Sequence, residues 1–260
     1  MSSSVVVLKF GGTSLASSVR VKRAALRVRA HLERGHSPVV VVSANGHATD
    51  RIVVRLAALG CSTGIAATRE ADRALATGED LSAALLAFAL AQLGIAARSL
   101  SGVEAGVRAE GAFGAGRIRS VDPEPLLALL RQGVVPVVSG FQGGREDGET
   151  LTLGRGGSDT SAVAIAAALA ARSCDIITDV RAVCDRDPRR YPDARAYPCL
   201  TYEALLALAR AGAEVVHPIA AEIAREAGVP LRVYHHRAPL SGGGGTRITT
   251  SAELAVEAVA

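Results

Sequence analysis

The stretch Val5-Val6-Val7-Leu8-Lys9-Phe10-Gly11-Gly12-Thr13-Ser14 sets the frame for the rest of the chain. Its first residues, Val5–Leu8, are β-branched or aliphatic, which is typical of a buried strand, and a helical pattern begins near Ser18. A glycine turn between a strand and a helix lets backbone N–H groups approach an anion closely, and Lys9 adds a full positive charge. The six residues from Lys9 to Ser14 therefore indicate a phosphate site, although an ordinary turn with a surface lysine explains them equally well.

The same alternation of strand and helix runs along the chain. Further β-branched runs predict strands at Val39–Val42, Val134–Val138, Ile176–Thr178, Leu231–Tyr234 and Thr246–Thr249. Alanine- and leucine-rich segments predict helices at Ser18–Glu33, Arg51–Leu59, Ser62–Thr77, Leu81–Leu93, Pro123–Arg131, Thr160–Arg172, Tyr202–Ala211 and Ile219–Glu226. Strands that alternate with helices favour an α/β fold, with an open, mainly parallel sheet sandwiched by helices in three layers.

Composition narrows the class of protein. A chain of 260 residues with 49% hydrophobic residues is expected to form one compact domain, and its apolar runs are too short to predict a membrane span. The N-terminus lacks the pattern of a signal peptide, so we expect a cytoplasmic protein. The net charge of +4 is spread along the chain without a basic block, which argues against nucleic-acid binding. Four widely spaced cysteines predict reduced thiols: Cys61, Cys174, Cys184 and Cys199.

A second glycine-rich turn lies at Thr150–Ser161 (TLTLGRGGSDTS), immediately before the apolar segment Ala162–Ala171. Ser158 or Asp159 is expected to cap the helix that follows, leaving its first N–H groups facing a concave turn. Arg155 is suited to clamp a carboxylate, and Asp159 to accept hydrogen bonds from an ammonium group. A simple helix cap remains the more common explanation of Asp159 taken alone.

A third candidate segment begins at the strand end Ile177-Thr178-Asp179-Val180 and continues to Asp187-Pro188-Arg189. Loops at the carboxyl ends of strands are where open α/β sheets bind ligands, although Asp-Pro-Arg alone is only a turn signal. The pair His235 and His236 is a weak metal candidate, because adjacent side chains of a strand point to opposite faces. Surface or packing histidines are the preferred interpretation.

Taken in order, these motifs resemble the catalytic domain of the aspartate kinases, within the amino acid kinase superfamily. The matching blocks are Lys9–Ser14, Val40–Asp50, Thr77–Leu86, Gly140–Gly143, Gly148–Ala162, Thr178–Arg189 and Gly212–Pro218. The resemblance implies the amino acid kinase or carbamate kinase-like fold, with an acceptor-binding half at about 1–150 and a nucleotide-binding half at about 151–260. It also implies that ATP phosphorylates the side-chain carboxylate of L-aspartate to an acyl phosphate.

The resemblance assigns roles residue by residue. Lys9 corresponds to the lysine that bridges the transferring phosphate, and Asp159 shares the catalytic centre and, with Glu79, receives the ammonium group of the acceptor. The acceptor-binding residues are Thr49, Glu79, Arg155, Gly156, Gly157 and Ser158. The nucleotide-binding residues are Gly11, Gly12, Ser14, Thr178, Asp179, Cys184, Asp187 and Arg189. Mg²⁺ is expected on the phosphates with no protein ligand, and the protein is expected to form a homodimer.

Phosphoryl transfer fits a chain without a nucleophilic triad. The reaction depends on positioning and on neutralising phosphate charge, and a carboxylate acceptor is already ionised at neutral pH. No general base is therefore required.

Departures from the family pattern leave alternatives open. Glu214 stands where many aspartate kinases have a lysine, and a carboxylate there repels phosphate unless it points away. The segment Arg181–Cys184 weakens the expected adenine site, and Phe113–Ile118 changes the pattern near the acceptor. The same chemistry on another amino acid or small carboxylate, and a degenerate kinase that only binds a nucleotide or oxyanion, are the competing hypotheses. We also expect no regulatory domain in this polypeptide, since it ends at Ala260 soon after the last strand.

Overall fold

The computed structural model describes residues 4–60, 68–186, 188, 190–212, 215–241 and 243–250. Its main sheet has eight strands in the order β10-β12-β11-β9-β1-β2-β6-β3. These strands are β1 (Ser4–Phe10), β2 (His36–Val42), β3 (Ala97–Leu100), β6 (Val135–Ser139), β9 (Ser173–Thr178), β10 (Cys199–Thr201), β11 (Leu231–His235) and β12 (Thr246–Thr249). The sheet is parallel from β3 to β11, whereas β12 runs antiparallel to β11 and β10 runs parallel to β12.

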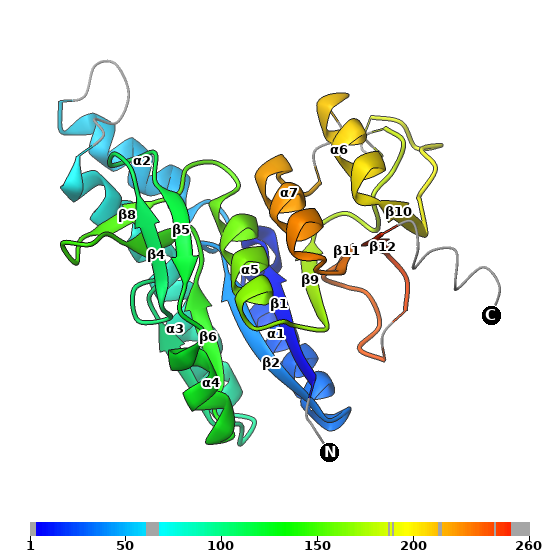
Figure 1. The fold of residues 1–260 in the computed structure, drawn as a ribbon, viewed down its shortest axis with the longest axis horizontal. Coiled ribbons are helices and arrows are strands. Elements are labelled where there is room, and N and C mark those ends of the chain that lie inside the picture. Colours follow the sequence, from blue (N-terminus) through cyan, green and yellow to red (C-terminus); the bar gives the residue numbers. More distant parts are fainter. Residues whose placement is uncertain are drawn as a thin grey trace.

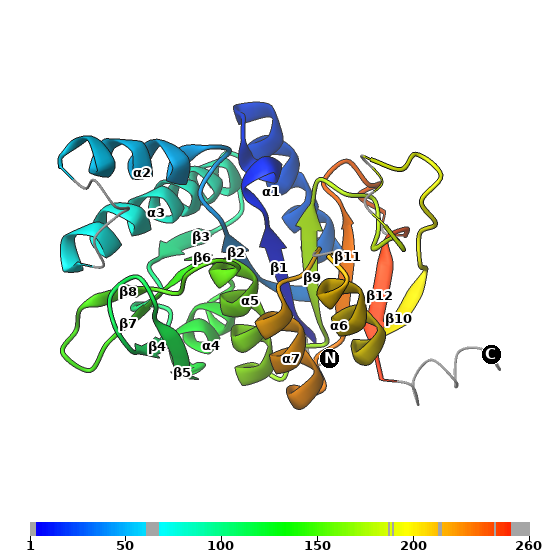
Figure 2. The same cartoon turned by 90° about the horizontal axis from the view of Figure 1, so that it is seen from above.

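Helices cover both faces of this sheet, as the three-layer prediction requires (Figure 1). Figure 2 shows α1 (Ser18–Glu33), α2 (Ala48–Ala58) and α3 (Arg69–Ala91) on one side of the main sheet. On the other side lie α4 (Glu124–Arg131), α5 (Gly157–Ala168), α6 (Tyr202–Arg210) and α7 (Pro218–Ala227). The predicted α/β architecture is confirmed.

The central strand β1 decides which side chains face which layer. Val6, Leu8 and Phe10 belong to the apolar core beneath α1 and α3, whereas Val7 belongs to the core beneath α5 and α7. Because successive side chains of a strand alternate between faces, Lys9 shares the α5 side with Val7. The strand thus places a lysine against the start of α5.

A small second sheet lies beside the first and was not predicted. It contains β5 (Arg117–Val121), β4 (Val107–Glu110), β7 (Gln142–Gly144) and β8 (Thr150–Thr152), in that order. Its strands have three to five residues and mix arginine, glutamine and glycine with isolated β-branched residues, so no continuous β-branched run occurs in them. Periodicity is too weak over such lengths to predict a strand.

Three helix predictions were wrong in their boundaries, and residues 62–67 of the helix predicted at Ser62–Thr77 lie outside the described residues. The predicted break between Thr77 and Leu81 is absent, and α3 runs unbroken through Gly78. A Cβ at Gly78 would lie 2.9 Å from the Cβ of Ala44, so the glycine allows close packing and does not end the helix. The helix predicted at Thr160–Arg172 begins earlier, at Gly157, and ends at Ala168 before a turn into β9.

Helix α3 is apolar enough and long enough to cross a membrane by length and composition alone. However, 44% of its most apolar window is buried within the protein. It also contacts β3 and β6 and carries the buried carboxylates of Asp72 and Glu79. These features are typical of a core helix in a globular domain.

Candidate active site

Two side chains from the first two glycine motifs meet in an ion pair. Lys9 Nζ lies 2.6 Å from Oδ1 of Asp159, and both side chains are largely shielded from solvent, with 11% and 13% exposed. Asp159 stands in the first turn of α5, and Lys9 is the penultimate residue of β1. The pair therefore lies at the carboxyl ends of the parallel strands, where open α/β sheets bind ligands.

The turn after β1 is held tightly to the neighbouring strands. The N–H of Gly11 donates to the carbonyl of Ile177 at 3.0 Å, and the hydroxyl of Ser14 donates to the same oxygen at 3.1 Å. A Cβ at Gly12 would lie 2.5 Å from the carbonyl oxygen of Ala44. The N–H of Gly11 and the hydroxyl of Ser14 thus fix the conformation of the turn.

Helix α5 begins differently from the prediction. Its N-cap is Gly156, in the left-handed region at φ 73°, and no side chain caps the helix. The predicted cap at Ser158 or Asp159 is therefore wrong, because both residues lie inside the first turn. A Cβ at Gly156 would lie 2.1 Å from Cγ of His217, so the imidazole occupies the space that only glycine leaves free.

The removal of Asp159 from the cap position has a chemical consequence. Its carboxylate is free to pair with Lys9, and its Oδ2 also accepts a long hydrogen bond, 3.4 Å, from the N–H of His217. Ser158 is buried beside it, and Gly157 has no space for a side chain, since a Cβ would lie 2.9 Å from Leu153 and Phe141. Arg155, in contrast, is exposed and makes no ion pair with the described residues, which leaves its guanidinium open to a ligand.

Glu79 is the most unusual titratable group near this centre. It is buried, and its Oε1 accepts a 2.9 Å hydrogen bond from the N–H of Ala44. Its Oε2 is buried without a hydrogen-bond partner among the described residues. Burial raises the pKa of Glu79 to about 7, opposed in part by that backbone hydrogen bond and by the charge of Lys9. A cation that binds here would restore the charged form.

The predicted nucleotide residues separate into two groups. Thr178 ends β9 directly after Ile177, which is paired with Phe10 of β1, so it lies beside the first glycine turn, and its hydroxyl donates to Asp179 at 3.3 Å. Cys184 is buried farther along the connection, in a bridge with Ala196, and burial raises the pKa of its thiol. Asp187, Arg189 and the divergent Glu214 lie outside the described residues.

His236 is buried, which agrees with a packing histidine, but the two adjacent histidines do not point to opposite faces as expected. His235 ends β11, and His236 lies beyond it in the following turn, so their rings stack with centroids 4.3 Å apart in place of pointing to opposite faces. The backbone leaves the strand between them, which removes the alternation. His236 contacts the carbonyl of Thr178 through Nδ1 at 3.1 Å. Within the described part of the chain, no group of three or more metal-binding side chains occurs.

Three residues at the site were not singled out from the sequence. Asp72 of α3 is buried and hydrogen-bonded to β8, His217 covers Gly156, and Phe141 adopts a φ of 66° beside Gly157. Positive φ is uncommon in an aromatic residue and marks local backbone strain, which often occurs at functional sites. Phe141 and His217 lie in the matching blocks Gly140–Gly143 and Gly212–Pro218, but only the packing of distant segments shows what any of the three contacts.

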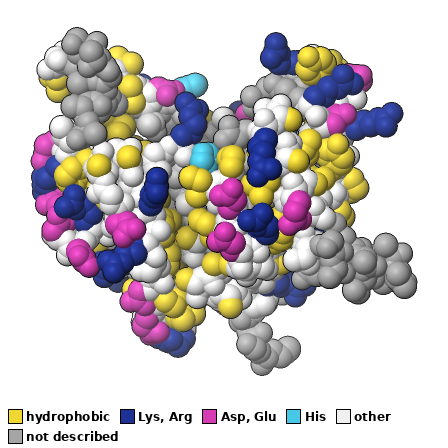
Figure 3. All heavy atoms as spheres, turned by 45° about the horizontal axis from the view of Figure 1, so that its top comes forward, with side chains coloured by type: hydrophobic (Ala, Val, Ile, Leu, Met, Phe, Trp, Pro, Cys, Tyr) yellow, Lys and Arg dark blue, Asp and Glu magenta, His cyan; other side chains and the backbone are white. Residues whose placement is uncertain are grey.

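Figure 3 shows the surface above these strand ends. Basic and acidic side chains are interspersed on the face shown.

Comparisons with known proteins agree with the fold. The model of the "Amino acid kinase family" matches residues 4–235. Aspartokinase 2 from Bacillus subtilis (strain 168) is 46% identical over 229 residues, which cover 88% of this chain and 55% of the relative. The chain thus spans about half the length of this relative.

Solved structures give the same result. The aspartate kinase from Synechocystis superposes with a TM-score of 0.79 at 40% identity, covering 95% of this chain and 40% of that one. Aspartokinase III from E. coli, in complex with aspartate and ADP, superposes with a TM-score of 0.82 at 25% identity, covering 95% and 64% of the two chains. The predicted resemblance and fold are therefore confirmed.

Proposed function

Because this chain belongs to the amino acid kinase family, we propose that it transfers the γ-phosphoryl group of ATP to the side-chain carboxylate of L-aspartate, forming 4-phospho-L-aspartate and ADP. The observation that carries the proposal is the Lys9–Asp159 ion pair at 2.6 Å, formed where the two glycine turns meet. The aspartokinase relatives support the acceptor, and the E. coli enzyme in complex with aspartate and ADP supports both ligands.

The acceptor's charged groups have complementary partners in the proposed site. Arg155 is exposed without an ion-pair partner and can bind the α-carboxylate through two parallel hydrogen bonds. Glu79 and Asp159 offer carboxylate oxygens to the ammonium group, and Thr49, in the first turn of α2, adds a hydroxyl. These contacts leave the side-chain carboxylate of the substrate directed to the phosphate.

Lys9 is proposed to supply the charge that phosphoryl transfer requires. A carboxylate oxygen of the acceptor bonds to the γ-phosphorus, and the bond from that phosphorus to the oxygen bridging the β- and γ-phosphates breaks as ADP leaves. Negative charge on the transferring group and on the leaving oxygen is stabilised by the ammonium of Lys9 and by N–H groups at the start of α5. Asp159 holds Lys9 in place at 2.6 Å.

The nucleotide is proposed to lie over Thr178 and Asp179, near Cys184, Asp187 and Arg189, with its phosphates above Gly11, Gly12 and Ser14. Bound Mg²⁺ would neutralise phosphate charge, and phosphate and water oxygens would supply its ligands, since the described residues hold no cluster of acidic, histidine or cysteine side chains. The halves 1–150 and 151–260 are proposed to bind the acceptor and the nucleotide respectively.

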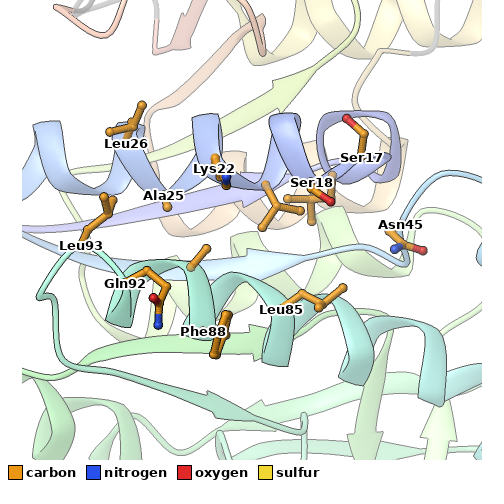
Figure 4. Close-up of a pocket in the computed structure, with 13 residues that line it drawn as sticks. Ser17, Ser18, Lys22, Ala25, Leu26, Asn45, Leu85, Phe88, Gln92 and Leu93 are labelled. Atoms are coloured by element: carbon orange, nitrogen blue, oxygen red, sulfur yellow. The ribbon is translucent and has the colours of Figure 1, made fainter.

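We also propose that the protein is a cytoplasmic homodimer. Along α3 the side chains of Leu81, Leu85 and Phe88 are 54%, 40% and 66% exposed and form one apolar stripe. Between α3 and α1 lies a groove of about 710 Å³, lined by Phe88, Leu85, Leu26 and Ala25 among others (Figure 4). Exposed apolar stripes of this kind mark interaction surfaces, and a second copy is the proposed occupant.

Sedimentation of Phe88→Glu tests the pairing, with Val54→Glu, at a similarly exposed position on α2, as the control. We expect only Phe88→Glu to dissociate into monomers, and a native protein that sediments as a monomer would contradict the dimer.

The proposed cytoplasmic location agrees with the state of the cysteines. The three described cysteines are free, as is typical of a reducing compartment.

Hydroxylamine trapping tests the activity itself. The chain is incubated with MgATP and each amino acid in turn, and acyl phosphate is captured as hydroxamate. Product with aspartate and none with Lys9→Ala is the expected result. Product with another acid would retain the mechanism and change the substrate, whereas ATP binding without product from any acid would favour a non-catalytic binding protein.

A further inference from the structure

Asp72 is a buried carboxylate that no part of the proposed reaction uses. It lies in the first turn of α3 with 1% of its surface exposed. Its Oδ2 accepts hydrogen bonds from the N–H of Thr152 at 2.8 Å and of Gly114 at 3.1 Å, and its Oδ1 accepts one from the hydroxyl of Thr152 at 3.0 Å. Three donors from two distant segments therefore converge on one side chain.

These segments form the wall between α3 and the second glycine turn. Thr152 ends β8 and precedes the turn that carries Arg155, while Gly114 lies in the loop between β4 and β5. The same loop is joined to β8 again, because the N–H of Gly116 donates to the carbonyl of Thr152 at 2.9 Å. Asp72 thus ties the helix, the strand end and the loop together at one point.

The helix that carries Asp72 also carries Glu79, about two turns farther along. Residues two turns apart lie on the same face of a helix. The distance between the ammonium site at Glu79 and the carboxylate site at Arg155 is therefore set through α3, Asp72 and the end of β8. A buried carboxylate with complete hydrogen bonding is a rigid connection, since breaking it leaves buried N–H groups unsatisfied.

We propose that Asp72 is a positioning residue that fixes the separation of the acceptor's ammonium and carboxylate sites, and so sets both the affinity for the acceptor and the choice between acceptors of different length. The inference rests on the proposed function, because it assumes that Glu79 and Arg155 grip an amino acid. Asp72 acts through these two residues and does not touch the substrate.

Steady-state kinetics of Asp72→Ala and Asp72→Asn test the proposal. In Asp72→Ala, KM for aspartate is expected to rise about 30-fold while KM for ATP changes less than about threefold, since two N–H groups lose their acceptor on the acceptor side only. The preference for aspartate over glutamate is expected to fall about tenfold. Asp72→Asn should keep most of the native KM, because the amide oxygen can accept both N–H groups and its NH₂ can donate to the hydroxyl of Thr152.

Asp122→Ala, at an exposed position, is the control for the loss of a carboxylate that accepts a backbone N–H. Asp122 also accepts a backbone N–H, from Glu124 at 3.0 Å, at the start of α4. Equal changes in KM for both substrates, or the same change in Asp122→Ala, would overturn the proposal in favour of a general loss of stability. Should Asp72→Ala not fold, Thr152→Val, which removes one of the three hydrogen bonds, is expected to raise KM for aspartate about threefold in the same selective way. An unchanged KM in that variant would also overturn the proposal.

Calorimetric titration of aspartate separates this proposal from the reaction itself. Native protein that binds aspartate without turnover would contradict the proposed kinase activity, and the loss of affinity in Asp72→Ala relative to Asp72→Asn would then decide the role of Asp72. Native protein that neither binds aspartate nor turns over would overturn both.

Discussion

The charged side chains are buried on the proposed acceptor side of the molecule but exposed in the connection after β9. On the acceptor side, Lys9, Asp72 and Glu79 are buried and bonded to specific protein atoms. In the connection after β9, Arg186 and Asp193 form an ion pair at 2.8 Å with 45% and 75% of their side chains exposed. Buried charges interact through a low dielectric, whereas exposed pairs are screened by water.

This difference indicates where the protein's own side chains determine the chemistry. Under the proposed function, the ammonium group of the acceptor meets buried, preorganised carboxylates, so single changes to these groups should have large effects. The exposed ion pair in the connection after β9 is screened by water, so a change to that pair should have a small effect. The following substitutions test that contrast.

The largest effect is expected for Lys9→Ala. Removal of its ammonium group should lower kcat about 1000-fold, because a positive charge aimed at the transferring phosphate is lost from a shielded site. Single-turnover kinetics with MgATP and aspartate measure the change, with Arg55→Ala on the exposed face of α2 as the control. A loss of less than about tenfold would remove Lys9 from the catalytic centre.

Gly156→Ala is expected to destabilise the fold by about 3 kcal/mol or more, because alanine at φ 73° is strained and its Cβ would meet the ring of His217. Gly228→Ala is the matched control: Gly228 has a φ of 65° at the end of α7, but a Cβ there meets nothing within 4 Å. Strain alone should cost about 1 kcal/mol in the control. Urea denaturation measures the free energy of unfolding of both variants. An equal loss of stability in the two would show that the ring of His217 moves aside at little cost.

Glu79 predicts a pH dependence of acceptor binding. Burial raises its pKa to about 7, and the ammonium group of the acceptor favours the ionised form, so KM for aspartate should fall about tenfold as pH rises from about 5.5 to 8. In Glu79→Gln, KM should be higher and nearly independent of pH over that range. A native KM that does not change with pH would contradict the buried, titrating carboxyl.

The stability of the free protein should respond to the same group. The folded pKa of about 7 lies above the ordinary value of 4.5, so the unfolded chain releases its proton first as pH rises. Stability is therefore lost between about pH 4.5 and 7 in the native protein but not in Glu79→Gln, apart from changes common to both. Thermal denaturation at several pH values compares the two proteins.

The smallest effect is expected for Asp193→Asn, which breaks the exposed pair with Arg186. Exposed ion pairs contribute about 0–1 kcal/mol to stability. The free energy of unfolding should therefore change by less than about 0.5 kcal/mol, and KM for ATP by less than about twofold. Chemical denaturation and ATP kinetics measure both. A large rise in KM for ATP would contradict the expectation that changes to exposed charged side chains have small effects.

The sequence predictions were accurate for long apolar strands and failed for short polar ones. Strands with β-branched runs, such as Ser4–Phe10 and His36–Val42, were predicted because a strand buried on both faces is apolar along its length. The strands Gln142–Gly144 and Thr150–Thr152 were missed, because three residues of glutamine, glycine, leucine and threonine give no periodic signal. Gly78 was taken as a break, although close contact with Ala44 requires a glycine within an unbroken helix.

The candidate site was predicted where its residues belong to a contiguous motif. Lys9 and Asp159 were both identified in glycine-rich turns, whereas Asp72, Phe141 and His217 were not, because each acts on a segment far away in the chain. Asp72 reaches Thr152 across 80 positions, and no spacing rule connects the two. The assignment of the catalytic, acceptor and nucleotide residues stays a prediction.

The sequence by itself determined the alternation of strands and helices, the two glycine-rich turns and the charged groups placed in them. These follow from local backbone preferences and from the burial of apolar residues, which act over a few neighbouring positions. Only the tertiary structure decided that Lys9 faces α5, that Gly156 and not Asp159 caps that helix, and that Glu79 is buried. These outcomes depend on contacts between distant segments, which set the dielectric, the available space and the hydrogen-bond partners of each group.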